Sequence, residues 1–195
     1  MTQPPGSVRE ALLSAAYDEA VAGEWDHARM ADVARTAGVS RQTLYNEFGS
    51  KDGLGQALVL RETERFLAGV EAALRNVTGD PHEAVGEAVG WTLTEAAENP
   101  LLKAVLTSAR GGPADGELFA FITTRAEPVL VAARDRLAAF LTARWPDLRT
   151  RDVLVISEIV IRLTVSHLVL PTEPVERTAA TTALLVARFV ERDLP

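Results

Sequence analysis

Apolar residues recur every three or four positions along most of this chain, which is the spacing of amphipathic helices. From these repeats, and from the residues that cap and stop helices, we predict helices at about 8–22, 29–38, 41–48, 51–76, 81–98, 100–110, 117–145, 149–169 and 174–192. No stretch alternates apolar and polar residues between hairpin turns, as a sheet would require. The pattern therefore predicts an all-α fold.

The predicted boundaries depend on a few capping residues. Ser7 and Glu10 form a capping box at the start of the first helix, with Val8 expected to face inward. Ser40 and Ser50 are N-cap candidates for the third and fourth helices. Residues 1–6 are expected to fray, and the Gly/Pro-rich stretch 111–116 reads as a loop.

Residues 30–48 form the pattern that carries most functional information. Two short helices are joined at Gly38, which suits the positive φ of a tight turn, and Ala34 allows the helices to cross closely. A helix-turn-helix that reads DNA has this arrangement, with its second helix in the major groove. A plain helical hairpin is the alternative that the same short pattern permits.

Charge and cysteine content narrow the possible partners and chemistry. The chain has a net charge of −7, but residues 29–51 hold four basic and two acidic side chains, so a small basic region lies in an acidic body. Because there is no cysteine, disulfides, thiolate metal sites and cysteine nucleophiles are excluded. No signal-peptide pattern and no membrane-length apolar run are present, and a cytoplasmic protein that does not enter a membrane is expected.

The run from Met30 to Leu54, MADVARTAGVSRQTLYNEFGSKDGL, closely resembles the signature of the TetR family of transcriptional regulators. The resemblance is clear from the first predicted helix into the fourth; beyond it, only length and helix count agree. It implies a three-helix DNA-binding domain at 1–50 and a ligand-binding and dimerisation domain of about six helices at 51–195. It also implies a homodimer that represses transcription and is released from DNA by a small molecule.

By the same resemblance, the start of the third helix contacts base edges of double-stranded operator DNA. Arg41 suits guanine and Gln42 suits adenine, the pairings expected in the major groove. Phosphate contacts are implied for Tyr45 and Asn46, and for Lys51 at the start of the fourth helix. Thr43 shares the base-contacting start of the third helix, Arg29 is a candidate for a phosphate contact, and Ser40 is a further DNA-contact candidate.

Three positions depart from the family pattern. Ala28 and Arg29 stand where the family commonly has a Thr or Ser that caps the second helix. Glu47 replaces a residue that is often aromatic or basic, and its charge should weaken binding to DNA unless a nearby base neutralises it. Gly53 stands where a glutamate often completes a capping box with Ser50, which predicts a loose start to the fourth helix.

The last two predicted helices indicate how two copies could associate. Helix 149–169 is apolar almost all round and needs cover on both sides. Helix 174–192 carries Ala179, Ala183 and Ala187 on one face, a spacing that allows close helix approach. Paired with their copies, the two helices predict a four-helix dimer interface that sets the recognition helices roughly 34–36 Å apart. The alternative is that both belong to the core of one subunit.

Pro128 lies inside the predicted helix 117–145, where it should produce a kink and free the carbonyl of Thr124. An apolar effector pocket is predicted around this kink, and a fatty-acyl or alkane-like molecule would fit it. Arg125 would pair with an anionic head group. The candidate lining is Phe66, Trp91, Leu102, Val105, Phe121, Thr124 and Arg125. The alternative is that these are core aromatics and a surface arginine.

No pattern typical of an enzyme, metal site or cofactor is found. His27, His82 and His167 are scattered, and no carboxylate partner at ligand spacing is expected for them. No nucleophile elbow and no glycine-rich loop after a strand occur. Three hypotheses remain, in this order: a ligand-gated DNA-binding regulator, a helical small-molecule-binding protein without DNA function, and a helical enzyme.

Overall fold

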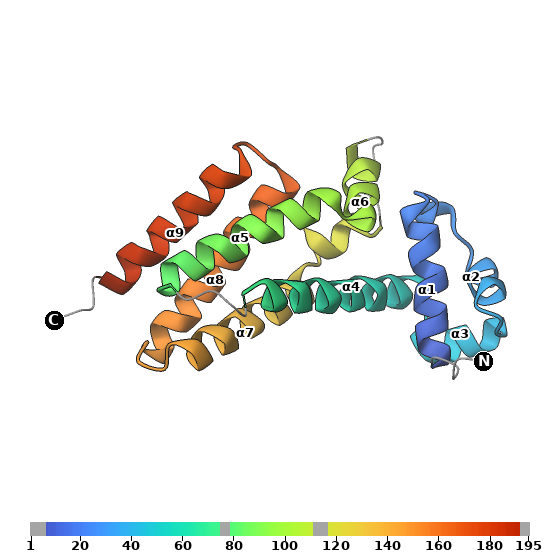
Figure 1. Ribbon diagram of the computed structural model, residues 1–195. Helices are drawn as coiled ribbons and strands as arrows, with labels where there is room; N and C mark the ends of the chain where they lie inside the picture. The colour runs from blue at the N-terminus through green and yellow to red at the C-terminus, as the bar shows by residue number, and fades with distance from the viewer. Residues whose placement is uncertain (1–6, 75–78, 111–116, 192–195) are drawn as a thin grey trace, which may run out of the picture. The chain divides into compact units, whose positions relative to one another are not determined.

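The computed structural model describes residues 7–74, 79–110 and 117–191, and within these ranges the regular structure is entirely helical (Figure 1). The predicted frayed segment 1–6, the predicted loop 111–116 and the predicted end of the fourth helix at residue 76 lie outside the described residues. No helix of the described chain is long and apolar enough to cross a membrane.

The described helices form two units, and helix α4 (Lys51–Leu74) contributes residues to both. The first unit, 1–62 with 99–126, holds the N-terminal helices and a later segment of the chain. Its other elements are α1 (Val8–Val21), η1 (Trp25–His27), α2 (Met30–Thr36), α3 (Arg41–Phe48), α6 (Pro100–Arg110) and η2 (Phe119–Ile122). The second unit, 63–98 with 127–195, contains α5 (Pro81–Glu98), α7 (Glu127–Arg144), α8 (Thr150–Val169) and α9 (Val175–Glu191).

Serine caps fix the starts of three helices, as predicted. The Oγ atoms of Ser7, Ser40 and Ser50 accept hydrogen bonds from backbone N–H groups three residues later, at 3.2, 3.0 and 3.0 Å. The expected inward position of Val8 is wrong, because Val8 is 45% exposed and the buried face of α1 begins one turn later at Leu12.

The predicted continuous helix 117–145 is also wrong. The segment contains the short helix η2 and then α7, which begins at Glu127. Pro128 therefore lies in the first turn of α7, where a proline fits because the first N–H groups of a helix have no partner within it. There is no mid-helix kink at Pro128, and the carbonyl of Thr124 precedes the helix instead of being freed from it.

In the second unit, helices α5 and α9 pack closely through small residues. A Cβ built on Gly86 would lie 3.0 Å from the Cβ of Ala183, and one on Gly90 would lie 3.6 Å from the Cβ of Ala179. The alanine stripe that the sequence assigned to the dimer interface therefore contacts α5 of the same chain at these two positions. The stripe matches the glycines of α5 in size, which is why it is covered from within the subunit.

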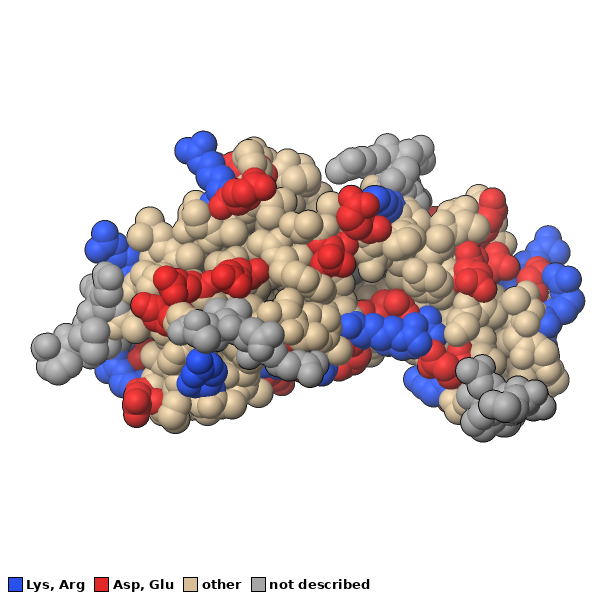
Figure 2. Space-filling view, in the orientation of Figure 1, with Lys and Arg blue, Asp and Glu red and all other residues tan. Residues whose placement is uncertain are grey.

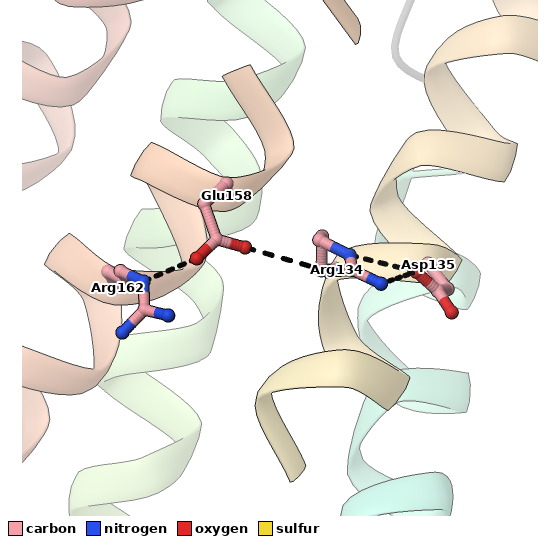
Figure 3. Close-up of polar contacts among 4 residues, drawn as sticks. All are labelled: Arg134, Asp135, Glu158 and Arg162. Atoms are coloured by element: carbon pink, nitrogen blue, oxygen red, sulfur yellow. Dashed lines mark hydrogen bonds and ion pairs between the residues drawn. The ribbon is translucent and has the colours of Figure 1, made fainter. Parts of the chain in front are cut away.

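Helix α8 is covered on one side only. Val153, Ile156 and Val160 are buried in the core of the second unit, whereas Leu154 and Ile159 are exposed. An ionic network joins the α7 and α8 surfaces (Figure 3). In it, Arg134 on α7 binds Asp135 at 2.7 Å and approaches Glu158 on α8 at 3.9 Å, while Glu158 also pairs with Arg162 at 2.5 Å.

Arg136 links α7 to the second half of α4. Its guanidinium donates to Glu71 at 2.5 Å and also pairs with Glu64. The hydrogen bond to Glu71 raises the pKa of Arg136 above its usual value, and burial opposes this shift. Through these ion pairs the arginine fixes α7 against the second half of α4 within the second unit.

Candidate functional site

Helices α2 and α3 form a helix-turn-helix whose geometry follows from a few residues. Gly38 has a φ of +70°, so it adopts the left-handed conformation that the tight turn requires. Val33 and Ala34 on α2 are 2% exposed, and Leu44 on α3 is fully buried. This packing fixes α3 in the first unit and leaves the opposite side of the helix in solvent.

The exposed side of α3 carries the predicted base-contacting residues. Arg41, Gln42 and Asn46 are exposed, and Thr43 and Tyr45 are half-buried. Two pairs of side chains on this side make contact across one helical turn. The guanidinium of Arg41 lies 5.3 Å from the centre of the Tyr45 ring, and Gln42 Nε2 donates to Asn46 Oδ1 at 2.8 Å. α3 therefore presents an ordered set of donors and acceptors.

Ser40 and Arg29, two further DNA-contact candidates, occupy the N-cap positions of α3 and α2. Ser40 acts as the N-cap of α3, and its Oγ also lies 2.8 Å from Thr43 Oγ1. Arg29 occupies the N-cap position of α2 and is exposed. Its side chain makes no capping hydrogen bond, which agrees with its departure from the family pattern.

In Figure 2, basic side chains lie over α2 at the right-hand edge, next to acidic ones. Within α2, Arg35 pairs with Asp32 at 2.7 Å.

Glu47 is neutralised by a residue that the sequence did not suggest. Arg9 on α1 donates to Glu47 Oε1 at 2.8 Å, and its guanidinium lies 4.7 Å from the centre of the Phe48 ring. The two residues are 38 positions apart, so no local pattern could connect them. The acid on α3 is thus compensated by a base on α1.

The ammonium group of Lys51 makes three contacts within the described part of the first unit. Its Nζ donates to the carbonyl of Asp26 at 3.0 Å, pairs with Glu117 at 3.1 Å and lies 5.6 Å from the centre of the Trp25 ring. Glu117 is fixed in turn, because its backbone N–H donates to Asp26 Oδ1 at 3.1 Å. Any phosphate contact by Lys51 would therefore compete with Glu117.

Gly53 has a steric reason to depart from the family pattern. A Cβ at this position would overlap the backbone carbonyl oxygen of Phe48, so a glutamate would not fit this backbone. The Ser50 cap is nevertheless made to the Gly53 N–H. Two residues later, a Cβ on Gly55 would meet Trp25 at 3.0 Å and Phe121 at 3.2 Å, which places η2 directly against α4 within the first unit.

The predicted ligand-contact residues divide between the two units. In the second unit, Phe66 and Trp91 are in contact, with ring centres 5.5 Å apart, and Trp91 lies so close to Gly69 that a Cβ there would be 2.7 Å from its ring. In the first unit, Val105 and Phe121 are buried, Leu102 is half-buried and Thr124 is exposed. Arg125 is 45% exposed, lies 4.4 Å from the Phe121 ring centre and pairs with Asp52 at 2.5 Å.

The expectation that no histidine has a carboxylate partner at ligand spacing is wrong for His82. His82 does have carboxylate neighbours, since its Nδ1 lies 3.5 Å from Asp80, and Glu83 completes a group whose candidate ligand atoms all lie within 4.8 Å of one another. These neighbours lie within three positions of one another at the start of α5, and the turn of the chain there brings their side chains together. Asp80 and Glu83 are exposed, and a cluster of this kind is common on protein surfaces.

An N-terminal helix-turn-helix, followed by a second all-helical unit, defines the chain as a helix-turn-helix transcriptional regulator. Two family models match it: residues 12–58 match the one described as bacterial regulatory proteins, tetR family, and residues 80–188 match the one described as bacterial tetracyclin repressor, C-terminal domain. The chain therefore belongs to the TetR family and is a transcriptional regulator, not an enzyme. Regulators of this family bind DNA, dimerise and bind small-molecule effectors.

Individual relatives agree with this assignment. The chain is 36% identical to the HTH-type transcriptional regulator AlkX of Mycobacterium tuberculosis, over 95% of this chain and 86% of the relative. The crystal structure of the TetR family repressor AlkX from Dietzia sp. strain DQ12-45-1b, implicated in biodegradation of n-alkanes, has a TM-score of 0.77 at 26% identity and covers 97% of this chain and 98% of that one. The R. erythropolis repressor QsdR has the same fold, with a TM-score of 0.70 at 21% identity over 96% of each chain.

Proposed function

We propose that this chain is a ligand-responsive repressor that binds a palindromic operator as a homodimer and leaves it when a small effector binds. The observation that carries the proposal is the exposed side of α3, which presents Arg41, Gln42 and Asn46. The helix itself is capped by Ser40 and anchored through buried Leu44. In this proposal residues 1–50 bind DNA, and residues 51–195 bind the effector and the second subunit.

The roles proposed within the DNA-binding part differ between base and phosphate contacts. Arg41 reads a guanine and Gln42 an adenine, with Thr43 beside them, because their side chains match the base edges of the major groove. Arg29, Ser40, Tyr45 and Lys51 contact the phosphate backbone, which fixes the position of the protein on the duplex without reading sequence.

For the effector we propose an apolar or amphipathic molecule of fatty-acyl or alkane-like type. Support comes from the apolar pair Phe66 and Trp91 in the second unit, whose ring centres lie 5.5 Å apart. Further support comes from the similar Dietzia repressor, which is implicated in biodegradation of n-alkanes. Release of the protein from its operator by a fatty acid or n-alkane, but not by a short polar analogue, is the expected result in a DNA-binding assay. Unchanged binding with both compounds would contradict this effector class.

For the second subunit we propose association through α8 and α9. Large apolar side chains on these helices stay exposed in the single chain: Leu154, Ile159, Leu184, Leu185 and Phe189. A patch of this kind typically marks an interface, since water contact with it is unfavourable. Two copies joined here would present two recognition helices to successive major grooves.

The proposed division of roles on α3 and α4 is tested with two variants. Arg41→Ala should reduce discrimination between operator and scrambled DNA by about 1–3 kcal/mol, because one bidentate base contact is lost. Lys51→Ala should weaken binding to all sequences and lower the slope of log K against log salt by about one. Discrimination by Arg41→Ala equal to that of the wild type would contradict base reading by Arg41.

A further inference from the structure

The side chains of Gln42 and Asn46 form a hydrogen-bonded pair on the exposed side of α3. Gln42 Nε2 donates to Asn46 Oδ1 at 2.8 Å across one helical turn, and both side chains are exposed. The helix beneath them is fixed by the Ser40 cap and by fully buried Leu44. The hydrogen bond therefore restricts the orientation of the Gln42 amide on a helix that is itself held in place.

The chemistry of the amide gives this restriction a consequence. A glutamine amide has two N–H donors and one carbonyl acceptor. With one N–H directed to Asn46, the second N–H and Oε1 stay available as one donor and one acceptor. Adenine offers the complementary set in the major groove, since N7 accepts and the N6 amino group donates. Asn46 thus leaves Gln42 with the pair of groups that adenine needs.

We propose that Asn46 is a positioning residue: it orients the Gln42 amide so that Gln42 reads an adenine of the operator. The proposal rests on the DNA-binding function proposed above and deepens it. It differs from the family-based expectation that Asn46 touches phosphate, because a phosphate contact adds affinity for every sequence, whereas an orienting contact adds preference for one base. Holding the amide before binding also removes part of the ordering cost for a flexible side chain.

The experiment begins with selection of binding sites by the wild-type protein from a library of randomised duplexes. The position that loses its base preference in Gln42→Ala is then replaced by each of the four base pairs. Affinity for these four duplexes and for scrambled DNA is measured for the wild type, Asn46→Ala, Asn46→Asp and the double variant Gln42→Ala/Asn46→Ala. Circular dichroism of each variant checks that the helices remain folded.

Asn46→Ala is expected to reduce the preference for adenine at this position by about 3- to 10-fold, part of the discrimination that one bidentate contact provides, with little change for scrambled DNA. Asn46→Asp keeps the acceptor Oδ and should retain the preference, while its added negative charge weakens binding to all sequences. In the Gln42→Ala background, Asn46→Ala should change base preference no further, because the group that it orients is absent.

The opposing outcomes are distinct. Equal weakening of all duplexes by Asn46→Ala, with the adenine preference intact, overturns the inference and favours a phosphate contact. A Gln42→Ala protein with unchanged base preferences at every position also overturns it, while leaving the proposed repressor function in place. Failure of the wild-type protein to enrich any sequence overturns the proposed function together with this inference.

Discussion

Charged side chains on and around α3 are compensated by partners from distant parts of the first unit. Arg9 pairs with Glu47, Glu117 pairs with Lys51, and Asp52 pairs with Arg125. These pairs are largely exposed, so each contributes little to the stability of the fold. Their effect is on the local potential that an approaching phosphate meets, because an uncompensated acid on the recognition helix would repel DNA.

We predict that Arg9→Gln weakens binding to specific and scrambled DNA alike, by about two- to fivefold, the size of an exposed ion-pair energy. The uncovered charge of Glu47 is the cause, so the double variant Arg9→Gln/Glu47→Gln should regain the lost affinity. Fluorescence anisotropy at two salt concentrations measures both effects. If the double variant binds no better than Arg9→Gln alone, Arg9 acts by contacting DNA itself.

The buried hydroxyl of Ser157 on α8 gives a prediction about the stability of the fold. Its side chain is fully buried, and Oγ lacks a hydrogen-bond partner within the described part of the chain. Because an unpaired buried hydroxyl costs about 1–3 kcal/mol, Ser157→Ala should leave the free energy of unfolding unchanged or raise it. The matched control is Thr164→Ala, which removes a buried hydroxyl that donates to the Val160 carbonyl at 2.8 Å and should lower stability by roughly 1–3 kcal/mol. A comparable loss in Ser157→Ala, by urea unfolding, would contradict this account.

The sequence predicted the local features of the site correctly and the distant ones not at all. Serine caps and the positive φ of Gly38 depend on residues within a few positions, so Ser40, Ser50 and Gly38 could be assigned from spacing alone. The partners of Glu47 and Lys51 come from elements far along the chain, and no periodicity encodes them. Base contacts by Arg41 and Gln42 stay predictions.

At the scale of helices, the hydrophobic repeat located most elements within one or two residues, for example α5 and α6. It failed between 117 and 127, where a helical pattern continues although a new helix begins at Glu127, with Pro128 in its first turn. It also could not say which neighbour covers the small face of α9. That assignment depends on the size match of Ala179 and Ala183 with the glycines of α5, which appears only when the two helices are seen together.

The two glycines of α5 give a matched prediction at this scale. Gly90→Ala should raise the free energy of unfolding by up to about 1 kcal/mol, since alanine favours helix and its Cβ makes an ordinary contact at 3.6 Å. Gly86→Ala should be less stable than Gly90→Ala, because the new Cβ lies 3.0 Å from the Cβ of Ala183 and one of the two helices must shift to accommodate it. Thermal unfolding of both variants measures the difference. Equal stabilisation by the two substitutions would show that the α5–α9 contact is looser than described.

At the scale of the whole molecule, the proposed homodimer depends on the exposed apolar surface of α8 and α9. Leu184→Glu should shift the protein from dimer to the monomer mass of 21.0 kDa, because Leu184 is 57% exposed in the single chain and would be buried by a second copy. Val131→Glu, at an exposed apolar position on α7 outside the proposed interface, is the control and should stay dimeric. Sedimentation velocity distinguishes the two, and a dimeric Leu184→Glu protein would place the interface elsewhere.

We propose above all that this chain is a sequence-specific DNA-binding dimer. The most direct test is fluorescence anisotropy of the purified protein with the intergenic DNA upstream of its own gene, at moderate salt and with scrambled competitor. We predict tight binding that resists the competitor, with one dimer bound to each palindromic site. Equal binding to both DNAs across the tiled intergenic region would contradict this account at that locus. The helical ligand-binding protein without DNA function would then become the leading hypothesis.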